Sequence, residues 1–337
     1  MTGLRVPVDL DDWQQWRARR TPVRSLKRRL GPGNRASVLA WTNSPEPPRV
    51  AVGVAATTAS GRAALVAPLA FMGETPCIVQ AEHAIDHLLP GWVRTPTPAA
   101  LPASVQVVLA DGHYLELGHD LWRGAQERGI PYLAVQHGLI TPLAPPLAPG
   151  AILLAWSEQD GLYWRAGRHD VSFEVVGSEL LWQAGAHTTA QGGDTGPLTY
   201  LGQGHAAELW RSRLAHAAMS TCREHGAVYR PHPSERDAVS RAVLAAYTRA
   251  GITIDTAGVP LVELDAPVVS VFSTGVLEAA AQGRNAWVDF PRPPAWLAAF
   301  WERYGMRRLG GPPTAAPARG ALKPARRVAE IVAAHAT

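Results

Sequence analysis

Two short motifs in the second half of the chain contain residues that could bind a phosphate. The first is Arg230-Pro231-His232-Pro233, and the second is Ser273-Thr274-Gly275, which lies between the apolar run 268–271 and a helix-forming sequence. The N-terminus of a helix has unpaired N–H groups and a partial positive charge, so an anion can bind there. A nearby histidine can add charge near neutral pH. The alternative is a simple helix cap formed by the Ser and Thr hydroxyls.

Further residues around these motifs could contribute to the same site. The turn Gly202-Gln203-Gly204 follows the apolar stretch 198–201 and precedes an expected helix over 208–224, so its backbone could face a phosphate. Arg230 could add positive charge. Glu278 would lie one turn into the helix after Ser273, where its carboxylate could accept hydrogen bonds from ribose hydroxyls.

The first half of the chain offers two candidates for a general base. Asp111 follows the strand-like stretch 105–110, and His137 follows the stretch 131–135. Ligands of parallel α/β sheets bind at the carboxyl ends of strands, where both side chains would lie. We prefer His137, because an imidazole with an ordinary pKa near 6.5 suits a base at neutral pH and Gly138 leaves room for a substrate. The plainer alternatives are Asp111 as a turn former and His137 as a hydrogen-bonded residue at a strand end.

The elements that would position these residues alternate between strand and helix. Such alternation predicts an α/β fold with parallel sheets. The stretch 183–197 contains few apolar residues and reads as a linker. We therefore expect a Rossmann-like domain over 1–182 with a basic lead-in, a second Rossmann-like domain over 198–300, and a helical tail over 301–337.

Composition narrows the class of protein. The chain of 337 residues has a net charge of +4, and Cys77 and Cys222 are its only cysteines, which fits a reduced cytoplasm. No apolar run reaches the roughly 18 residues that a membrane span needs. The basic lead-in, with Trp13 and Trp16 beside it, could contact an anionic membrane surface, although a solvated basic face explains it more simply. No nucleic-acid motif accompanies the charge. The basic run comprises Arg17, Arg19, Arg20, Arg24, Lys27, Arg28 and Arg29.

Taken together, the order of motifs resembles the two-domain (GT-B) glycosyltransferases of bacterial surface polysaccharide synthesis. It is most similar to the polysialyltransferase-like capsule enzymes and to the glycerophosphotransferases that build teichoic acids. The resemblance covers roughly residues 100–290. It rests on the His-Pro turn at His232, on the helix start at Ser273 and Thr274, and on His137-Gly138 in the first half.

This resemblance implies two Rossmann-like domains that face a central cleft, with the acceptor bound by the first domain and the nucleotide donor by the second. His232, Ser273, Thr274 and Gly275 would bind the donor phosphate, with His232 as an imidazolium that balances the charge of the leaving group. The polysialyltransferase-like enzymes have two acidic residues before a glycine. This chain has Ala110-Asp111-Gly112 and so retains only one of them.

The expected activity is therefore metal-independent transfer of a sugar from a nucleotide-activated donor, for example a CMP-linked one, to a glycan or small-molecule acceptor. Neither a cofactor nor a metal is expected, because no metal-ligand spacing or Asp-x-Asp motif is present. We expect a cytoplasmic protein, with peripheral membrane contact through the basic N-terminus and without a nucleic-acid partner.

Three other functions stay open on the sequence alone. Transfer of a phospho-polyol from a CDP-activated donor differs only in the donor bond that is broken. A nucleotide-sugar 2-epimerase is less favoured, because the acidic and histidine signatures of that family are not evident. A non-catalytic relative that binds nucleotide or glycan would explain the single acid at Asp111.

Overall fold

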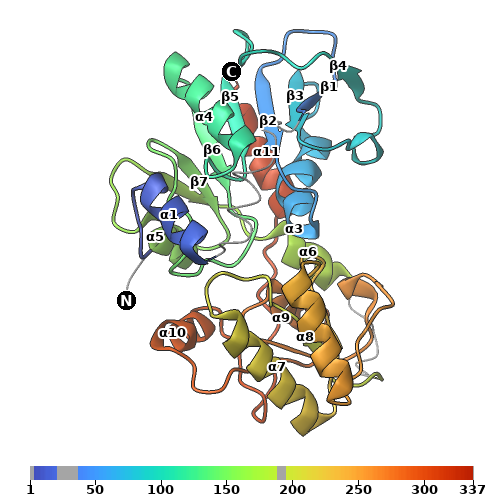
Figure 1. Ribbon diagram of the computed structural model, residues 1–337. Helices are drawn as coiled ribbons and strands as arrows, with labels where there is room; N and C mark the ends of the chain where they lie inside the picture. Colours follow the sequence, from blue (N-terminus) through green and yellow to red (C-terminus); the bar gives the residue numbers. More distant parts are fainter. Residues whose placement is uncertain (1–3, 21–36, 188–194, 337) are drawn as a thin grey trace. The chain divides into compact units, whose positions relative to one another are not determined.

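The structure is a computed structural model that describes residues 4–20, 37–187 and 195–336 (Figure 1). It divides into two compact units, and each is described by itself. Unit 1 contains residues up to Leu180 together with the segment from Gly320 onward, and unit 2 contains Leu181–Arg319. Among the described residues, no helix is long and apolar enough to span a membrane.

Unit 1 is built on an eight-stranded sheet in the order β4-β1-β3-β2-β5-β6-β7-β8. Strands β3, β2, β5, β6, β7 and β8 pair with one another in parallel, in this spatial order. Strand β1 pairs antiparallel with both β3 and β4. The strands are β1 Leu39–Thr42, β2 Val50–Val54, β3 Cys77–Ala81, β4 Val93–Thr95, β5 Val107–Ala110, β6 Tyr132–Val135, β7 Ile152–Ala155 and β8 Ser172–Val175.

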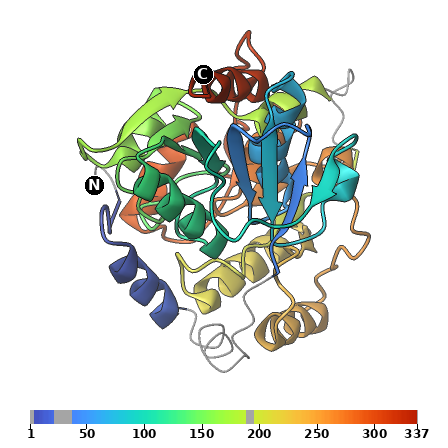
Figure 2. The ribbon, with the colours of Figure 1, turned by 90° about the horizontal axis from the view of Figure 1, so that it is seen from above.

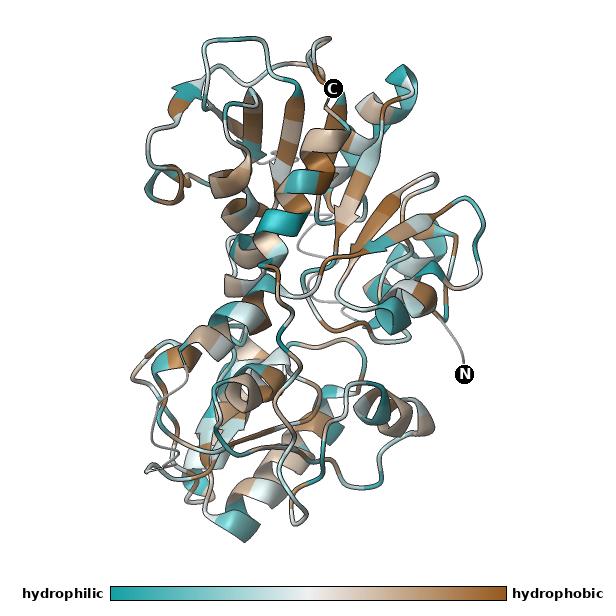
Figure 3. Ribbon diagram, turned by 180° about the vertical axis from the view of Figure 1, so that it is seen from behind, coloured by the Kyte–Doolittle hydropathy of each residue, from teal (hydrophilic) through white to brown (hydrophobic). Residues whose placement is uncertain are grey.

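Helices cover both faces of this sheet, which explains why its central strands are apolar along their whole length. Val52 faces the apolar cluster that contains Val328 and Val332 of α11 (Pro324–Ala334). Ala51, one residue earlier, faces the opposite cluster with Leu121 of α4 (Glu116–Arg128). Figure 2 shows the strands between α11 and α4, and Figure 3 shows the hydrophobic colour along them.

Shorter helices complete unit 1. Helix α5 (Glu158–Arg165) follows β7, and a helical segment after β2 runs through α3 (Ala59–Gly61), a π-helical turn and a 3-10 turn that ends at Phe71. Helix α1 (Leu10–Arg20) is anchored by Trp13, which is buried and donates its indole N–H to Leu143 O at 2.8 Å. Trp13 is therefore a packing residue and is unavailable to a membrane. The basic residues Arg24, Lys27, Arg28 and Arg29 lie outside the described residues.

Unit 2 has a four-stranded, fully parallel sheet in the order β10-β9-β11-β12. Its strands are β9 Thr199–Leu201, β10 Val228–Arg230, β11 Val268–Ser270 and β12 Ala286–Val288. Its helices are α6 Glu179–Ala186, which crosses the division between the units, α7 Arg211–His225, α8 Ala238–Arg249, α9 Thr274–Ala281 and α10 Ala295–Arg303.

The strand order places a topological switch point in each sheet. In unit 1 the chain passes from β2 to β3 on one side and later returns to β5 on the other side of β2. In unit 2 it passes from β9 to β10 and then returns to β11 on the other side of β9. The carboxyl ends of the two strands at such a point bound a crevice in which ligands of α/β sheets bind.

The α/β fold with two Rossmann-like units is confirmed, while the cleft that we expect between them stays a prediction. The division differs from the expected one at its C-terminal end. Residues 301–319 belong to unit 2, and residues from Gly320 onward belong to unit 1. The reason is that α11 buries Val328, Ile331 and Val332 against the core of unit 1. Part of the expected linker is helix α6, and residues 188–194 lie outside the described residues.

Substitution of Gly118 tests how closely α4 packs against the loop after β5. A Cβ at this position would lie 2.1 Å from Gly112 O, which is a backbone atom. Replacing a helical glycine with alanine normally stabilises by about 0.5–1 kcal/mol, whereas overpacking costs about 1–3 kcal/mol. We expect Gly118→Ala to lower the free energy of unfolding in urea titrations. Gly185→Ala in α6 is the control, because its Cβ would meet only ordinary contacts at 3.6 Å and beyond. Equal stability of the two variants would contradict the packing argument.

Candidate functional site

In unit 2, Gln203 connects the two loops that border the switch point. This residue follows β9 and is only 9% exposed. Its side-chain Oε1 accepts hydrogen bonds from Phe272 N at 2.8 Å and from Ser270 Oγ at 3.1 Å. Gln203 therefore acts within the protein, where it fixes the turn that leads into α9.

Glu235 connects the same loop to the turn after β10. Its carboxylate accepts hydrogen bonds from Gly204 N at 2.8 Å and from the Tyr229 hydroxyl at 2.8 Å. Burial opposes ionisation of Glu235, but the nearby His205 ring, 4.0 Å away, and the hydrogen bonds from Tyr229 and Gly204 outweigh it and lower the pKa of the carboxyl. A Cβ on Gly202 would lie 2.4 Å from the Tyr229 hydroxyl. The two glycines thus accommodate Tyr229 and Glu235, and the N–H of Gly204 that we expected to face a phosphate already has an acidic partner.

His232 lies in the turn after β10 and is held in one orientation. Its ring stacks on that of His205 with 3.8 Å between centroids. Its Nδ1 accepts a hydrogen bond from Ser234 N at 3.1 Å, which assigns the ring proton to Nε2. Burial, together with the neighbouring His205, lowers the pKa of His232 to about 4. The expected imidazolium is therefore a neutral imidazole at pH 7, because its surroundings disfavour a positive charge.

The turn after β11 has the geometry of an anion-binding helix start. Ser273 is the N-cap of α9, and its Oγ accepts a hydrogen bond from Gly275 N at 3.1 Å. Among the described residues, the backbone N–H groups of Ser273 and Thr274 have no hydrogen-bond partner. A Cβ on Gly275 would lie 2.7 Å from Leu201, so glycine permits the close approach of α9 to β9.

Two residues expected at the donor site are engaged elsewhere in unit 2. Arg230 forms an ion pair with Asp255 at 3.1 Å and donates to Val259 O, so its guanidinium supports the loop after β10. Glu278 lies within α9 and is 9% exposed. Burial raises the pKa of Glu278 to about 7 against the opposing effect of Arg284. Neither arrangement supports the direct contact with a nucleotide that the sequence suggested.

In unit 1, Asp111 ends β5 at the switch point and is only 3% exposed. One carboxyl oxygen, Oδ1, is fully buried and has no hydrogen-bond partner among the described residues. Burial raises the pKa of Asp111 to about 6, although the nearby His137 opposes this shift, and the negative charge of Glu82 adds to it. An unpaired buried carboxyl oxygen costs stability, and such groups are concentrated at functional sites.

His137 follows β6 and is half-buried. Its Nδ1 lies 3.4 Å from Val135 O, which assigns the ring proton to Nδ1, and its Nε2 lies 3.3 Å from the Tyr114 hydroxyl. The lone pair of Nε2 therefore accepts a hydrogen bond from Tyr114. The Tyr114 ring packs edge-on against Trp13 of α1 with 5.8 Å between centroids.

The structure adds three residues that the sequence analysis did not select. Tyr114 contacts His137, His205 stacks on His232, and Glu235 fixes the loop before His205. Glu235 lies two residues after the Pro233 of the His-Pro motif, and His205 directly follows Gly204. Their positions next to these motifs could have identified both residues from the sequence. His113 is buried, and its ring forms a cluster with those of His119 and Trp122.

In the part of the chain that the structure describes, no group of three or more His, Cys, Asp or Glu side chains is placed to hold a metal ion. Cys77 and Cys222 are buried free thiols. The groups that the described residues bring to the two candidate sites are imidazoles, buried carboxyls and backbone N–H groups.

Comparison with known proteins gives little beyond the fold. No protein-family model matches the chain. No curated protein matches it either. A solved structure with a similar fold is the UDP-GlcNAc 2-epimerase from Methanocaldococcus jannaschii, with a TM-score of 0.40, 12% sequence identity, and coverage of 68% of this chain and 77% of that one.

Asp111→Asn should change the pH dependence of stability. The carboxyl has a pKa of about 6 in the folded protein and an ordinary value near 3.8 when unfolded. Between these values the folded state binds more protons, so wild-type stability falls as pH rises and the full penalty is present above pH 6. We expect the variant to gain roughly 2–3 kcal/mol relative to wild type on going from pH 4 to pH 8. Urea unfolding at both pH values measures this difference, and an equal offset at both would contradict it.

Proposed function

We propose that this protein is a metal-independent glycosyltransferase that transfers a sugar from a nucleotide-activated donor, such as a CMP-linked sugar, to a glycan or small-molecule acceptor. Unit 2 binds the donor and unit 1 binds the acceptor. The reaction requires the acceptor and donor residues to face each other across the predicted cleft. In each unit, residues near the switch point of the sheet support the proposal.

The observation that carries the proposal is the connection of three strand-end loops around one switch point. Gln203 fixes the loop after β11, which presents Ser273 and Thr274. Glu235 fixes the turn after β10, which presents His232. Both act on the loop after β9, so the His232 turn and the helix start are held relative to one another. A preorganised set of donors of this kind suits a phosphate.

A neutral His232 can still stabilise the leaving phosphate. Its Nε2–H can donate a hydrogen bond, since Nδ1 is occupied by Ser234 N–H. A bound phosphate anion would raise the pKa of the imidazole, because an opposite charge nearby favours the protonated form. As the bond between the anomeric carbon and the phosphate oxygen breaks, the electron pair leaves with the phosphate. The imidazole and the N–H groups of α9 stabilise that charge without a metal.

On the acceptor side we assign the base to His137 and a supporting role to Asp111. His137 is half-buried, so an acceptor hydroxyl can reach it, whereas the buried Oδ1 of Asp111 cannot be reached without rearrangement. The hydroxyl oxygen would bond to the anomeric carbon while its proton passes to His137 Nε2. Tyr114 must first release that lone pair. The charge of Asp111 would stabilise the imidazolium that forms, as a buried carboxylate does beside other catalytic histidines.

Nucleotide binding without turnover is a second candidate. It is favoured by the neutral His232 and by the N–H of Gly204 that Glu235 already occupies. A CDP-polyol phosphotransferase would use the same residues but break the phosphate–phosphate bond of the donor. A panel of CMP-, UDP-, GDP- and CDP-activated donors, with detection of released nucleotide and of the transferred group, distinguishes these activities.

The donor role of His232 can be tested by two substitutions. His232→Ala removes the Nε2–H that we assign to the donor phosphate. We expect turnover to fall on the order of a hundredfold. His232→Gln keeps an N–H donor and should retain more activity if a neutral hydrogen bond suffices. His225→Ala, at the partly exposed end of α7, is the control. The assay measures nucleotide release in the presence of EDTA. Unchanged turnover in His232→Ala, or complete loss of wild-type activity in EDTA, would overturn the proposal.

The two base candidates are separated by their single variants. We expect His137→Ala to lower the rate by about 100–10,000-fold, which is the usual contribution of a general base. Asp111→Asn should cause a smaller loss, and it should shift the acidic limb of the pH–rate profile because the charge beside His137 is removed. If Asp111→Asn is inactive while His137→Ala turns over normally, the aspartate is the base instead.

A further inference from the structure

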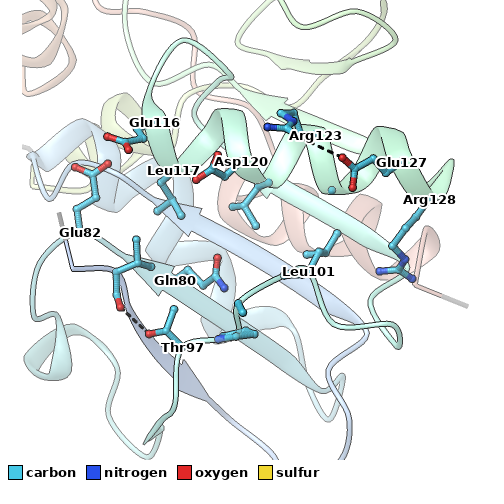
Figure 4. Close-up of a pocket in the computed structure, with 16 residues that line it drawn as sticks. Gln80, Glu82, Thr97, Leu101, Glu116, Leu117, Asp120, Arg123, Glu127 and Arg128 are labelled. Carbon is cyan, nitrogen blue, oxygen red and sulfur yellow. Dashed lines mark hydrogen bonds and ion pairs between the residues drawn. The ribbon is translucent and has the colours of Figure 1, made fainter. Parts of the chain in front are cut away.

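A pocket of about 490 Å³ runs beside α4 in unit 1, within the range of about 300–1,000 Å³ typical of small-molecule sites. Helix α4 forms one wall, and the chain segment 97–101 forms the opposite wall. Figure 4 shows Gln80 between these walls, near the end of β3, and Glu82 and Glu116 at one end. Every residue that lines this pocket belongs to unit 1.

Gln80 is the first indication that the pocket binds a ligand. The residue is only 7% exposed, yet its amide has no hydrogen-bond partner among the residues described here. Figure 4 shows this amide directed into the pocket. No contact within the described fold uses the hydrogen-bonding groups of this amide. A ligand that both donates and accepts hydrogen bonds would satisfy this group.

Charge is the second indication. The lining contains four carboxylates and two guanidiniums. Arg128 donates to the carbonyl oxygens of Pro102, Ala103 and Val105, and Arg123 pairs with Glu127 at 3.4 Å. Both cations are therefore engaged in the wall, and the lining residues carry a net negative formal charge. Glu82 and the amide of Gln80 can bind sugar hydroxyls, whereas this formal charge disfavours a ligand with phosphate or carboxylate groups.

The pocket also extends toward Asp111. Glu82 lines it and is close enough to Asp111 for its negative charge to act on that carboxyl. Glu116 begins α4, five residues after Asp111. A ligand bound along α4 would therefore have one end near Asp111, which in turn acts on His137.

We propose that this pocket binds the acceptor and that the acceptor is an uncharged sugar or polyol. The inference rests on the proposed transferase function and makes it more specific. A negative pocket disfavours the anionic chains that polysialyltransferases and teichoic acid enzymes extend. This chain would then differ in acceptor class from the enzymes that its motifs resemble.

The test measures sugar binding without any donor nucleotide. Saturation-transfer NMR on the full-length protein uses methyl glucoside, methyl galactoside, N-acetylglucosamine, lactose and glycerol as uncharged probes, and sialyllactose and glycerol 3-phosphate as anionic probes. We expect at least one uncharged probe to bind and neither anionic probe to do so. Gln80→Met keeps the length of the side chain but removes its hydrogen-bonding groups, and it should weaken binding of that probe about tenfold.

The controls separate a failure of this inference from a failure of the proposed function. Because the amide of Gln80 bonds to nothing in the described fold, Gln80→Met should leave the melting temperature equal or higher. Gln106→Met, at a residue outside the pocket that accepts from Arg49, should leave sugar binding unchanged. Lack of binding by every uncharged probe, binding of an anionic probe, or wild-type binding by Gln80→Met would overturn the inference. Nucleotide release from the donor panel would still test the transferase function independently.

Discussion

The arrangement of unit 2 depends on one buried carboxylate, that of Glu235. It is 7% exposed and is held by the N–H of Gly204 and the hydroxyl of Tyr229. Removing a partner from a buried charged group of this kind costs several kcal/mol. These two bonds fix the loop after β9 against the turn after β10, and the stacking of His205 on His232 follows from the same contact. Glu235 thus supports the orientation that the Ser234 N–H and the ring of His205 give to His232.

Burial explains the electrostatic state of both candidate sites. It lowers the pKa of His232 to about 4 and raises that of Asp111 to about 6. Both effects disfavour the charged form, so His232 is neutral at pH 7, whereas Asp111 is mostly ionised there but less stable as a carboxylate than an exposed aspartate. An anionic phosphate beside His232, or an imidazolium at His137 beside Asp111, would reverse this preference. The opposite charge of the ligand or of the reaction intermediate would then stabilise the charged form of His232 or of Asp111.

Much of the fold could be predicted because the buried parallel strands are uninterrupted apolar runs and the helices end at glycine. The run 268–271 and the cap at Ser273 are examples, and α9 begins where the sequence indicates. Short or irregular elements could not be predicted. Strand β4 is exposed and lacks an apolar pattern, and the segment after β2 changes from π to 3-10 geometry at Pro68. Ile254 likewise forms only an isolated bridge with Tyr229.

Within the candidate sites, position along the chain was predictable but side-chain direction was not. Arg230 and His232 are two residues apart, yet Arg230 turns to Asp255 while His232 stacks on His205. A strand end fixes where a backbone lies, and the partners of a side chain depend on segments remote in sequence, such as Asp255 for Arg230. For the same reason the glycines at 202 and 204, which suggested a phosphate loop, in fact accommodate Tyr229 and Glu235.

Some polar side chains bond to other residues of the protein, whereas others have no partner among the described residues and could bond to a ligand. Gln203 and Glu235 are buried, Arg230 is partly exposed, and all three side chains bond to other residues of unit 2, so their substitution would first change stability. Asp111 Oδ1 is fully buried and the amide of Gln80 faces a pocket, and neither has a hydrogen-bond partner among the described residues. The internal contacts of the described fold therefore use neither group. Both lie near the carboxyl ends of β3 and β5, the two strands that flank β2 in the sheet of unit 1, and ligand binding at that edge is the physical explanation that accounts for both.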